Sequence, residues 1–224
     1  MTGTITVFAA ASLQDAFTSL GEKFEAEHPG SKVVFNFGPS SGLATQIGQG
    51  APADVFASAS TKTMDQVVTG GDAADPKAFA ANTMEIAVPP DNPAGVKEVA
   101  DLARKGVKLA LCQADVPCGV TAAKVFLNAR ITVMPVTEEI DVRAVLSKVT
   151  LGEVDAGLVY VTDVRAAGGS VQGIEIPDDV NASTTYPIAA LTASKNQATA
   201  QAFVDYVLST DGAAALTAAG FSKP

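Results

Sequence analysis

The stretch KVVFNFGPSSGLATQIGQ, residues 32–49, passes from a strand-like run through a Gly-Pro-Ser-Ser-Gly turn into a helix-like run. Residues 38–42 of the turn also fit the pattern G-x-S-x-G, in which a serine between a strand and a helix acts as a nucleophile. The segment therefore raises two hypotheses for Ser40, a nucleophile or a polar group at the start of a helix.

The same strand-to-helix unit recurs along the whole chain. Nearly continuous apolar strands that alternate with helices predict an α/β fold with parallel sheets. The strands are too many for one small sheet, so we expect two doubly wound lobes joined by a hinge of two chain crossings. The first lobe would comprise residues 1–83 and 187–224 and the second residues 84–186, with a ligand cleft between them. We expect strands at 4–10, 32–37, 53–59, 83–90, 107–113, 131–136 and 155–163, and extended segments at 169–177 and 184–193. We expect helices at 13–28, 43–50, 61–71, 95–106, 119–129, 141–153, 197–209 and 211–220.

The bulk composition allows a globular protein and disfavours some classes of protein. The chain has 224 residues, 47% of them hydrophobic and 17% charged, which allows a sizeable core. The net charge of −9 disfavours a nucleic-acid partner, which normally selects a basic protein. No apolar run approaches the roughly 20 residues of a membrane span. The first residues show no leader pattern, which fits either a cytosolic protein or a chain that begins after a removed leader.

The two cysteines, Cys112 and Cys118, are separated by five residues. This spacing is neither a C-x-x-C redox pair nor a zinc site, because His28 is the only histidine. Two interpretations stay open, a pair of small buried thiols or a structural disulfide across a strand-to-helix loop in an oxidising compartment. The acidic clusters lack the spacing of a calcium loop, so we expect no metal ion held directly by side chains.

In an open α/β sheet, ligands bind beyond the carboxyl ends of the strands. The corners there present Ser12, Ser40 and Tyr160, together with the helix starts in residues 116–120 and 138–143. First-turn N–H groups, serine hydroxyls and a phenol make an uncharged set of donors for an anion. The alternative is that each serine only caps its own helix.

The nucleophile hypothesis for Ser40 lacks a general base. His28 precedes the strand that leads to Ser40, and a six-residue strand spans about 20 Å, too far for proton transfer. No S-x-x-K pattern offers a lysine instead. We therefore expect a binding protein without enzymatic activity, and keep a serine hydrolase that uses Ser40 as the alternative from a different class.

Several stretches are similar to one known family: ITVFAAASL, SSGLATQIGQGAPADVFASA, VPCG, DVRAVL, GLVYVTD and YPIAALTAS. The chain resembles the periplasmic molybdate-binding proteins of ABC importers, which have the type II periplasmic-binding-protein fold. Two positions depart from that family, Pro39 in a turn that is usually richer in serine and Cys118 where alanine is frequent. The resemblance implies five ligand positions, the hydroxyl and N–H groups of Ser12 and Ser40, the N–H groups of Cys118 and Val142, and the phenol of Tyr160.

The resemblance also implies a function. The chain would capture molybdate, and also tungstate, by closing its two lobes around the anion, and would need no cofactor. Its partners would be the permease and the ATPase of an importer, with the chain itself a monomer. It would act in the periplasm or on the outer face of the cytoplasmic membrane, free or lipid-anchored, with its leader absent from this sequence. Sulfate or phosphate binding on the same fold is the runner-up, and the sensor domain of a regulator is disfavoured because no DNA-binding module is attached.

Overall fold

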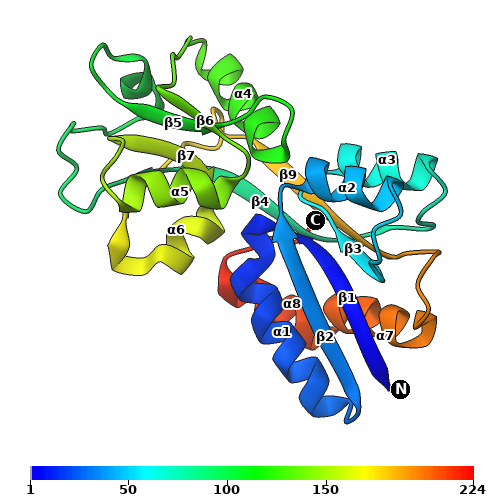
Figure 1. Ribbon diagram of the computed structural model, residues 1–224. Helices are drawn as coiled ribbons and strands as arrows, with labels where there is room; N and C mark the ends of the chain where they lie inside the picture. The colour runs from blue at the N-terminus through cyan, green and yellow to red at the C-terminus, as the bar shows by residue number, and fades with distance from the viewer. Residues whose placement is uncertain (1) are drawn as a thin grey trace. The chain divides into compact units, whose positions relative to one another are not determined.

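The computed structural model describes residues 2–224, which form two compact units (Figure 1). Unit 1 contains the chain up to Ala81 together with Thr185–Pro224, and unit 2 contains Asn82–Thr184. The chain crosses from one unit to the other inside strand β4 (Lys77–Val88) and again inside strand β9 (Ser183–Ala190). Each unit has its own hydrophobic core, formed by one cluster of buried residues in unit 2 and two in unit 1.

Unit 1 is built on a sheet with the strand order β2–β1–β3–β9. Strands β1 (Gly3–Ala10), β2 (Ser31–Gly38) and β3 (Val55–Ala57) are parallel, whereas β9 runs antiparallel to β3. Its helical elements are η1 (Ala11–Leu13), α1 (Gln14–Glu27), α2 (Ser40–Gly48), α3 (Thr61–Thr69), α7 (Gln197–Leu208) and α8 (Thr210–Ala219).

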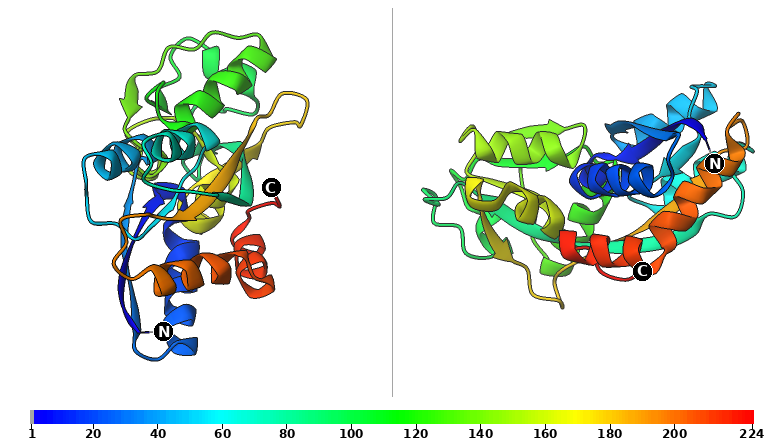
Figure 2. Two further views of the ribbon diagram at one scale, coloured as in Figure 1. Left: turned by 90° about the vertical axis from the view of Figure 1, so that its right-hand side faces the viewer. Right: turned by 90° about the horizontal axis from the view of Figure 1, so that it is seen from below.

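Both faces of the unit 1 sheet are covered by helices. Alternate residues of β1 serve two clusters: Ile5 and Val7 join the aromatic residues of α1 and α7, and Phe8 joins the apolar residues of α2 and α3. Helices α7 and α8 follow one another and both contact α1 (Figure 2). Burial on both faces explains why these strands read as continuous apolar runs.

Unit 2 has the strand order β4–β7–β5–β6, with β8 (Gln172–Glu175) paired to β4. Strands β5 (Leu109–Cys112), β6 (Thr137–Glu139) and β7 (Ala156–Tyr160) are parallel, and β4 runs antiparallel to β7 and β8. Its helical elements are η2 (Val99–Ala103), α4 (Pro117–Ala129), α5 (Val142–Thr150), α6 (Val161–Ala167) and η3 (Gly168–Ser170).

The α/β class is confirmed, but the sheets are mixed, because β4 and β9 are antiparallel to their neighbours. The predicted helix at 95–106 is wrong, since only η2 forms there. The side chain of Asn92 bonds both the N–H and the carbonyl of Val96, and Gly95 has a φ of +59°, so a closed loop precedes the helix. A capping box of Glu98 and Asp101 then starts the short 3-10 turn.

The predicted strand at 131–136 is also wrong, because β6 begins only at Thr137. Pro135 has no N–H to donate to a ladder, and Met134 is 87% exposed. The third predicted element that differs is the strand 155–163, which ends at Tyr160 instead of continuing to residue 163. Asp163 accepts a hydrogen bond from the Tyr160 N–H there, and helix α6 begins.

Candidate functional site

In unit 1 the parallel strands bring two predicted site residues to one edge of the sheet. Ala10 at the end of β1 pairs with Gly38 at the end of β2, and Ala9 pairs with Ala57 at the end of β3. Ser12 and Ser40 follow the first two of these strands, so both serines lie beyond the carboxyl edge.

Ser40 is the first residue of α2 and its side chain is almost fully buried. Its Oγ accepts a hydrogen bond of 3.0 Å from the backbone N–H of Ala59, just after β3. The residue before the helix is Pro39, which makes no side-chain cap. The hydroxyl of Ser40 thus joins two corners of unit 1, and this bond leaves the hydroxyl proton for another acceptor.

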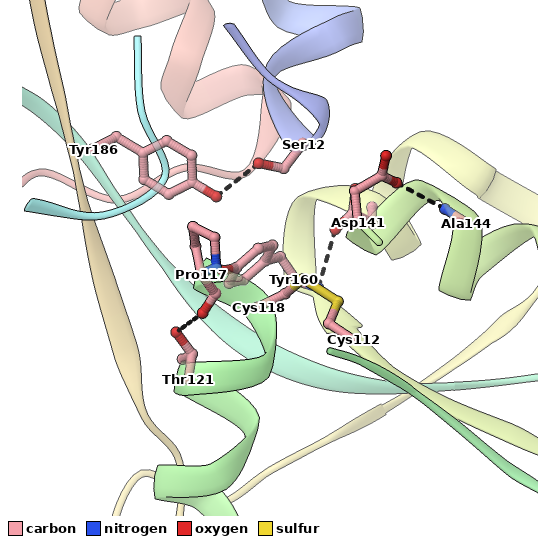
Figure 3. The surroundings of a disulfide bond; sticks show 10 residues. Ser12, Cys112, Pro117, Cys118, Thr121, Asp141, Ala144, Tyr160 and Tyr186 are labelled. Atoms are coloured by element: carbon pink, nitrogen blue, oxygen red, sulfur yellow. Dashed lines mark hydrogen bonds between the residues drawn. A yellow bond between two sulfur atoms is a disulfide. The ribbon is translucent and has the colours of Figure 1, made fainter. Parts of the chain in front are cut away.

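Ser12 lies in η1 and is also buried. Its Oγ is 2.8 Å from the phenolic oxygen of Tyr186, a hydrogen bond in which either oxygen can be the donor (Figure 3). The strand-end rule does not select Tyr186, because this residue lies near the start of β9. Since β9 is antiparallel to β3, its first residues come to the edge where β3 ends.

His28 lies away from this edge. It follows the end of α1, where its Nδ1 is 3.0 Å from the carbonyl of Phe24 and its ring stacks on the Phe24 ring. The eight residues of β2 separate this turn from the corner of Ser40, a span of about 26 Å. The structure therefore places no imidazole base beside Ser40 within unit 1.

In unit 2 the other three predicted site residues share one edge. Cys112 at the end of β5 pairs with Glu139 at the end of β6, and β7 runs parallel to β5. Cys118 is the second residue of α4, Val142 is the first residue of α5, and Tyr160 is the last residue of β7. First-turn N–H groups have no acceptor within their own helix, so those of Cys118 and Val142 can serve a ligand.

A disulfide links Cys112 at the end of β5 to Cys118 in α4 (Figure 3). Their Cα atoms are 5.8 Å apart, and both residues are buried. Of the two interpretations left open by the sequence, the structure has the disulfide. The bond ties the start of α4 to the strand that precedes it.

An ion pair between Arg143 and the buried carboxylate of Asp163 connects the corners of Val142 and Tyr160. The carboxylate of Asp163 accepts from the Tyr160 N–H at 3.1 Å and lies 3.4 Å from Nε of Arg143, the residue after Val142. The Asp163 side chain is fully buried. The positive charge of Arg143 is therefore balanced within unit 2, which leaves the donors at this edge uncharged.

The start of α5 is capped by Asp141, whose carboxylate accepts from the N–H of Ala144 at 2.9 Å. No three His, Cys, Asp or Glu side chains within residues 2–224 are arranged to hold a metal ion. Within the same residues, no helix combines the length and the apolar character needed to cross a membrane. The edge of unit 1 thus presents hydroxyls, and the edge of unit 2 presents a phenol and backbone N–H groups, the kinds of donor that suit an oxyanion.

Two α/β units that share two chain crossings form the type II periplasmic-binding-protein fold. The chain belongs to the family of bacterial extracellular solute-binding proteins, whose sequence model matches residues 5–222.

Several relatives in this family carry the name of a molybdate-binding protein. The chain is 45% identical to the molybdate-binding protein ModA of Mycobacterium tuberculosis, over 98% of this chain and 85% of the relative. It is 34% identical to ModA of Escherichia coli, over 98% of this chain and 89% of the relative.

Solved structures agree on the fold. The periplasmic molybdate-binding protein of Azotobacter vinelandii matches with a TM-score of 0.85 at 20% identity, over 98% of this chain and 99% of that one. The sulfate-binding protein SubI of Mycobacterium tuberculosis matches with a TM-score of 0.83 at 18% identity, over 100% and 87%. At such low identities these two matches establish the fold and not the ligand.

Proposed function

We propose that this chain captures molybdate for an ABC importer. The observation that carries the proposal is the pair of buried serine hydroxyls at one sheet edge, Ser12 and Ser40, in a chain 45% identical to a molybdate-binding protein. Molybdate is a tetrahedral dianion that only accepts hydrogen bonds, so its site needs several donors and no base.

Both units would contribute donors to the bound anion. Unit 1 would supply the hydroxyls and N–H groups of Ser12 and Ser40. Unit 2 would supply the N–H groups of Cys118 and Val142 and the phenol of Tyr160. Strands, a disulfide and an ion pair hold these donors in place, so binding costs little conformational entropy. For this reason neutral dipoles can bind a dianion tightly.

This set of donors favours some oxyanions over others. Tungstate is nearly the same size as molybdate, so we expect both to bind. Sulfate has the same charge and shape but is smaller, and a rigid set of donors fits it less well. A protonated phosphate also donates a hydrogen bond, so its site needs an acceptor. The hydroxyls at the serine corners are better suited to donate, which disfavours phosphate.

The anion would be carried outside the cytoplasm, in keeping with an extracellular solute-binding family. Its proposed partners are the permease and the ATPase of the importer, with hinge closure of the two units around the anion. We propose that the chain acts as a monomer, without a cofactor and without catalysis.

Thermal melting with sodium molybdate, tungstate, sulfate and phosphate tests the ligand. A ligand at 1,000 times its Kd stabilises the folded chain by about 4 kcal/mol. For a chain of this size that corresponds to a rise in Tm of roughly 8–15 °C. We expect this rise with molybdate and tungstate only. A rise with sulfate and none with molybdate would reassign the chain to sulfate.

Serine variants test the site, with isothermal titration of molybdate as the measurement. Ser12→Ala and Ser40→Ala should each weaken binding by about 1–3 kcal/mol, because a buried charged acceptor loses one donor. Ser41→Ala is the matched control in the same turn and should bind as the wild type does. Hydrolysis of a simple ester by the wild type, lost in Ser40→Ala, would favour the hydrolase instead.

A further inference from the structure

Tyr186 is buried next to a proposed ligand residue, yet no step of the proposed function uses it. Its phenolic oxygen lies 2.8 Å from Oγ of Ser12, and the two residues are 174 positions apart in the sequence. Its ring is completely inaccessible to solvent. A buried phenol at this distance from a site hydroxyl can control the orientation of that hydroxyl.

The position of the phenol is fixed by its surroundings in unit 1. The Tyr186 ring makes edge contacts with the rings of Phe79 and Phe221, at centroid distances of 6.2 and 5.3 Å. The next residue, Pro187, accepts a backbone hydrogen bond from Ser58 at 2.9 Å. Ring and backbone are thus held on both sides, so the phenolic oxygen keeps its place beside Ser12.

The direction of the hydrogen bond decides what Ser12 can do. A serine hydroxyl has one proton and two acceptor sites. If Ser12 donates to Tyr186, its proton is not available to an anion. If Tyr186 donates to Ser12, the serine proton remains free for the ligand, and the two bonds in series strengthen each other. An oxyanion that only accepts selects the second arrangement.

We propose that Tyr186 is a positioning residue that donates its O–H to Ser12 Oγ and so directs the Ser12 proton to the bound oxyanion. The proposal rests on the proposed function of the chain as an oxyanion-binding protein. It makes Tyr186 a determinant of affinity that does not itself contact the ligand.

A double-mutant cycle with molybdate as the probe tests the proposal. Tyr186→Phe keeps the ring and removes only the hydroxyl, and we expect it to weaken molybdate binding about tenfold, as for the loss of one hydrogen bond to a polar group. In a Ser12→Ala background the same change should have almost no further effect. In a Ser40→Ala background it should again weaken binding about tenfold, because Ser40 bonds Ala59 and not Tyr186.

The chain offers a matched control in Tyr206, whose hydroxyl donates to Glu27 at 3.2 Å. Tyr206→Phe should lose that bond without any change in molybdate affinity. A role of Tyr186 in stability alone would lower the Tm of the ligand-free variant and weaken binding equally in the Ser12→Ala and Ser40→Ala backgrounds. The proposal would be overturned by equal weakening in the two backgrounds. It would also be overturned if Tyr186→Phe bound molybdate as tightly as the wild type, or if this variant did not fold.

The same titrations separate the two proposals. If the wild type binds molybdate and Tyr186→Phe binds equally well, the positioning role fails and the proposed function stands. If the wild type binds none of molybdate, tungstate, sulfate and phosphate, the proposed function fails and the positioning role fails with it.

Discussion

Asp163 shows how a single buried carboxylate can hold two corners of a site. It accepts a hydrogen bond from the backbone of Tyr160 and pairs with the guanidinium of Arg143, which directly follows Val142. A buried charge is tolerated only when its partners satisfy it. The side chain of Asp163 therefore fixes the relative position of α5 and α6 at the edge where Val142 and Tyr160 lie.

Replacement of the Asp163 carboxylate by an amide should lower the stability of the chain. Asp163→Asn keeps the size of the side chain but leaves Arg143 without its counter-charge, so we expect a loss of roughly 3 kcal/mol in the free energy of unfolding. Urea denaturation measures this loss. The control is Asp75→Asn, which breaks the largely exposed pair with Lys77 and should cost less than about 1 kcal/mol. Equal losses in the two variants would contradict the role given to Asp163.

Glu85 makes the stability of unit 2 depend on pH. It lies opposite Glu175 in the register of β4 and β8. Burial, and secondly the charge of Glu175, raise the pKa of Glu85 above its usual 4.5, and Arg165 opposes this rise only in part. The folded chain thus holds this proton more tightly than the unfolded chain, so the free energy of unfolding falls as the pH rises from about 4.5 through the raised pKa.

Glu85→Gln should remove this dependence. At pH 7 we expect the variant to melt about 1–2 °C above the wild type, a small gain because the side chain is partly exposed to solvent. At pH 4 the difference should vanish, since the wild-type carboxyl is then protonated and resembles the amide. Calorimetry at both pH values measures the effect, with Glu22→Gln on the exposed face of α1 as the control. A difference that is larger at pH 4 would have the wrong sign.

Among the elements, the start of α4 packs closely against the loop that precedes it. Pro117 occupies its first position, where a missing N–H has no consequence, and the Val120 N–H donates to Val116. A Cβ at Gly119 would lie 1.9 Å from the carbonyl oxygen of Gln113, so no larger residue fits without a shift of the helix. The close approach of helix and loop therefore requires glycine here.

Gly119→Ala should displace the start of α4. We expect a loss of about 1–3 kcal/mol in the free energy of unfolding. Molybdate binding should weaken as well, because the proposed Cys118 donor moves with the helix. Urea denaturation and titration measure the two effects. Gly48→Ala is the control, since nothing lies within 4 Å of its added Cβ and alanine favours a helix by about 0.5–1 kcal/mol. A Gly119→Ala variant as stable as the wild type would rule out the close approach.

The elements also show what the sequence could predict. Apolar periodicity located most of the helices and the strands buried on both faces, because burial determines that pattern. It misplaced residues 95–106 and 131–136, where the side chain of Asn92 and the missing N–H of Pro135 decide the local structure. It also missed α6, which begins because Asp163 caps its first turn.

The candidate site was predictable only in part. Strand ends select Ser12 and Ser40 in unit 1 and Tyr160 in unit 2, since the parallel strands of each unit bring their carboxyl ends to one edge of its sheet. The bond between Ser12 and Tyr186 lay beyond prediction, because it joins residues 174 positions apart and depends on the antiparallel direction of β9. The same holds for the bond from Ala59 to Ser40, which depends on how two neighbouring corners pack.

At the scale of the whole molecule, the two units differ in how the chain builds them. Unit 2 is one continuous segment, Asn82–Thr184, whereas unit 1 combines both ends of the chain. The core of unit 1 includes Phe17 of α1 together with Ile188 of β9 and Phe203 of α7. The first 81 residues alone therefore lack a large part of the apolar surface that covers their strands.

Fragments of the chain should fold accordingly. Residues 82–184 alone should give a cooperative urea transition, followed by circular dichroism, because their core is complete. Residues 2–81 alone should give none. A fusion of residues 2–81 to residues 185–224 through a short Gly-Ser linker is the matched control and should fold. A cooperative transition in residues 2–81 would show that β9, α7 and α8 are dispensable to unit 1.

Because of the disulfide at the end of β5, the covalent form of each molecule depends on the redox conditions in which it folded. It forms only where thiols can be oxidised, and both of its cysteines are buried, so reductants and oxidants reach it poorly once the chain has folded. A molecule that folds in a reducing cytosol would keep two enclosed thiols and a looser start of α4 long after transfer to an oxidising medium. The order of secretion and folding would then decide which covalent form of the protein persists, and two preparations of one sequence could differ in ligand affinity for that reason alone.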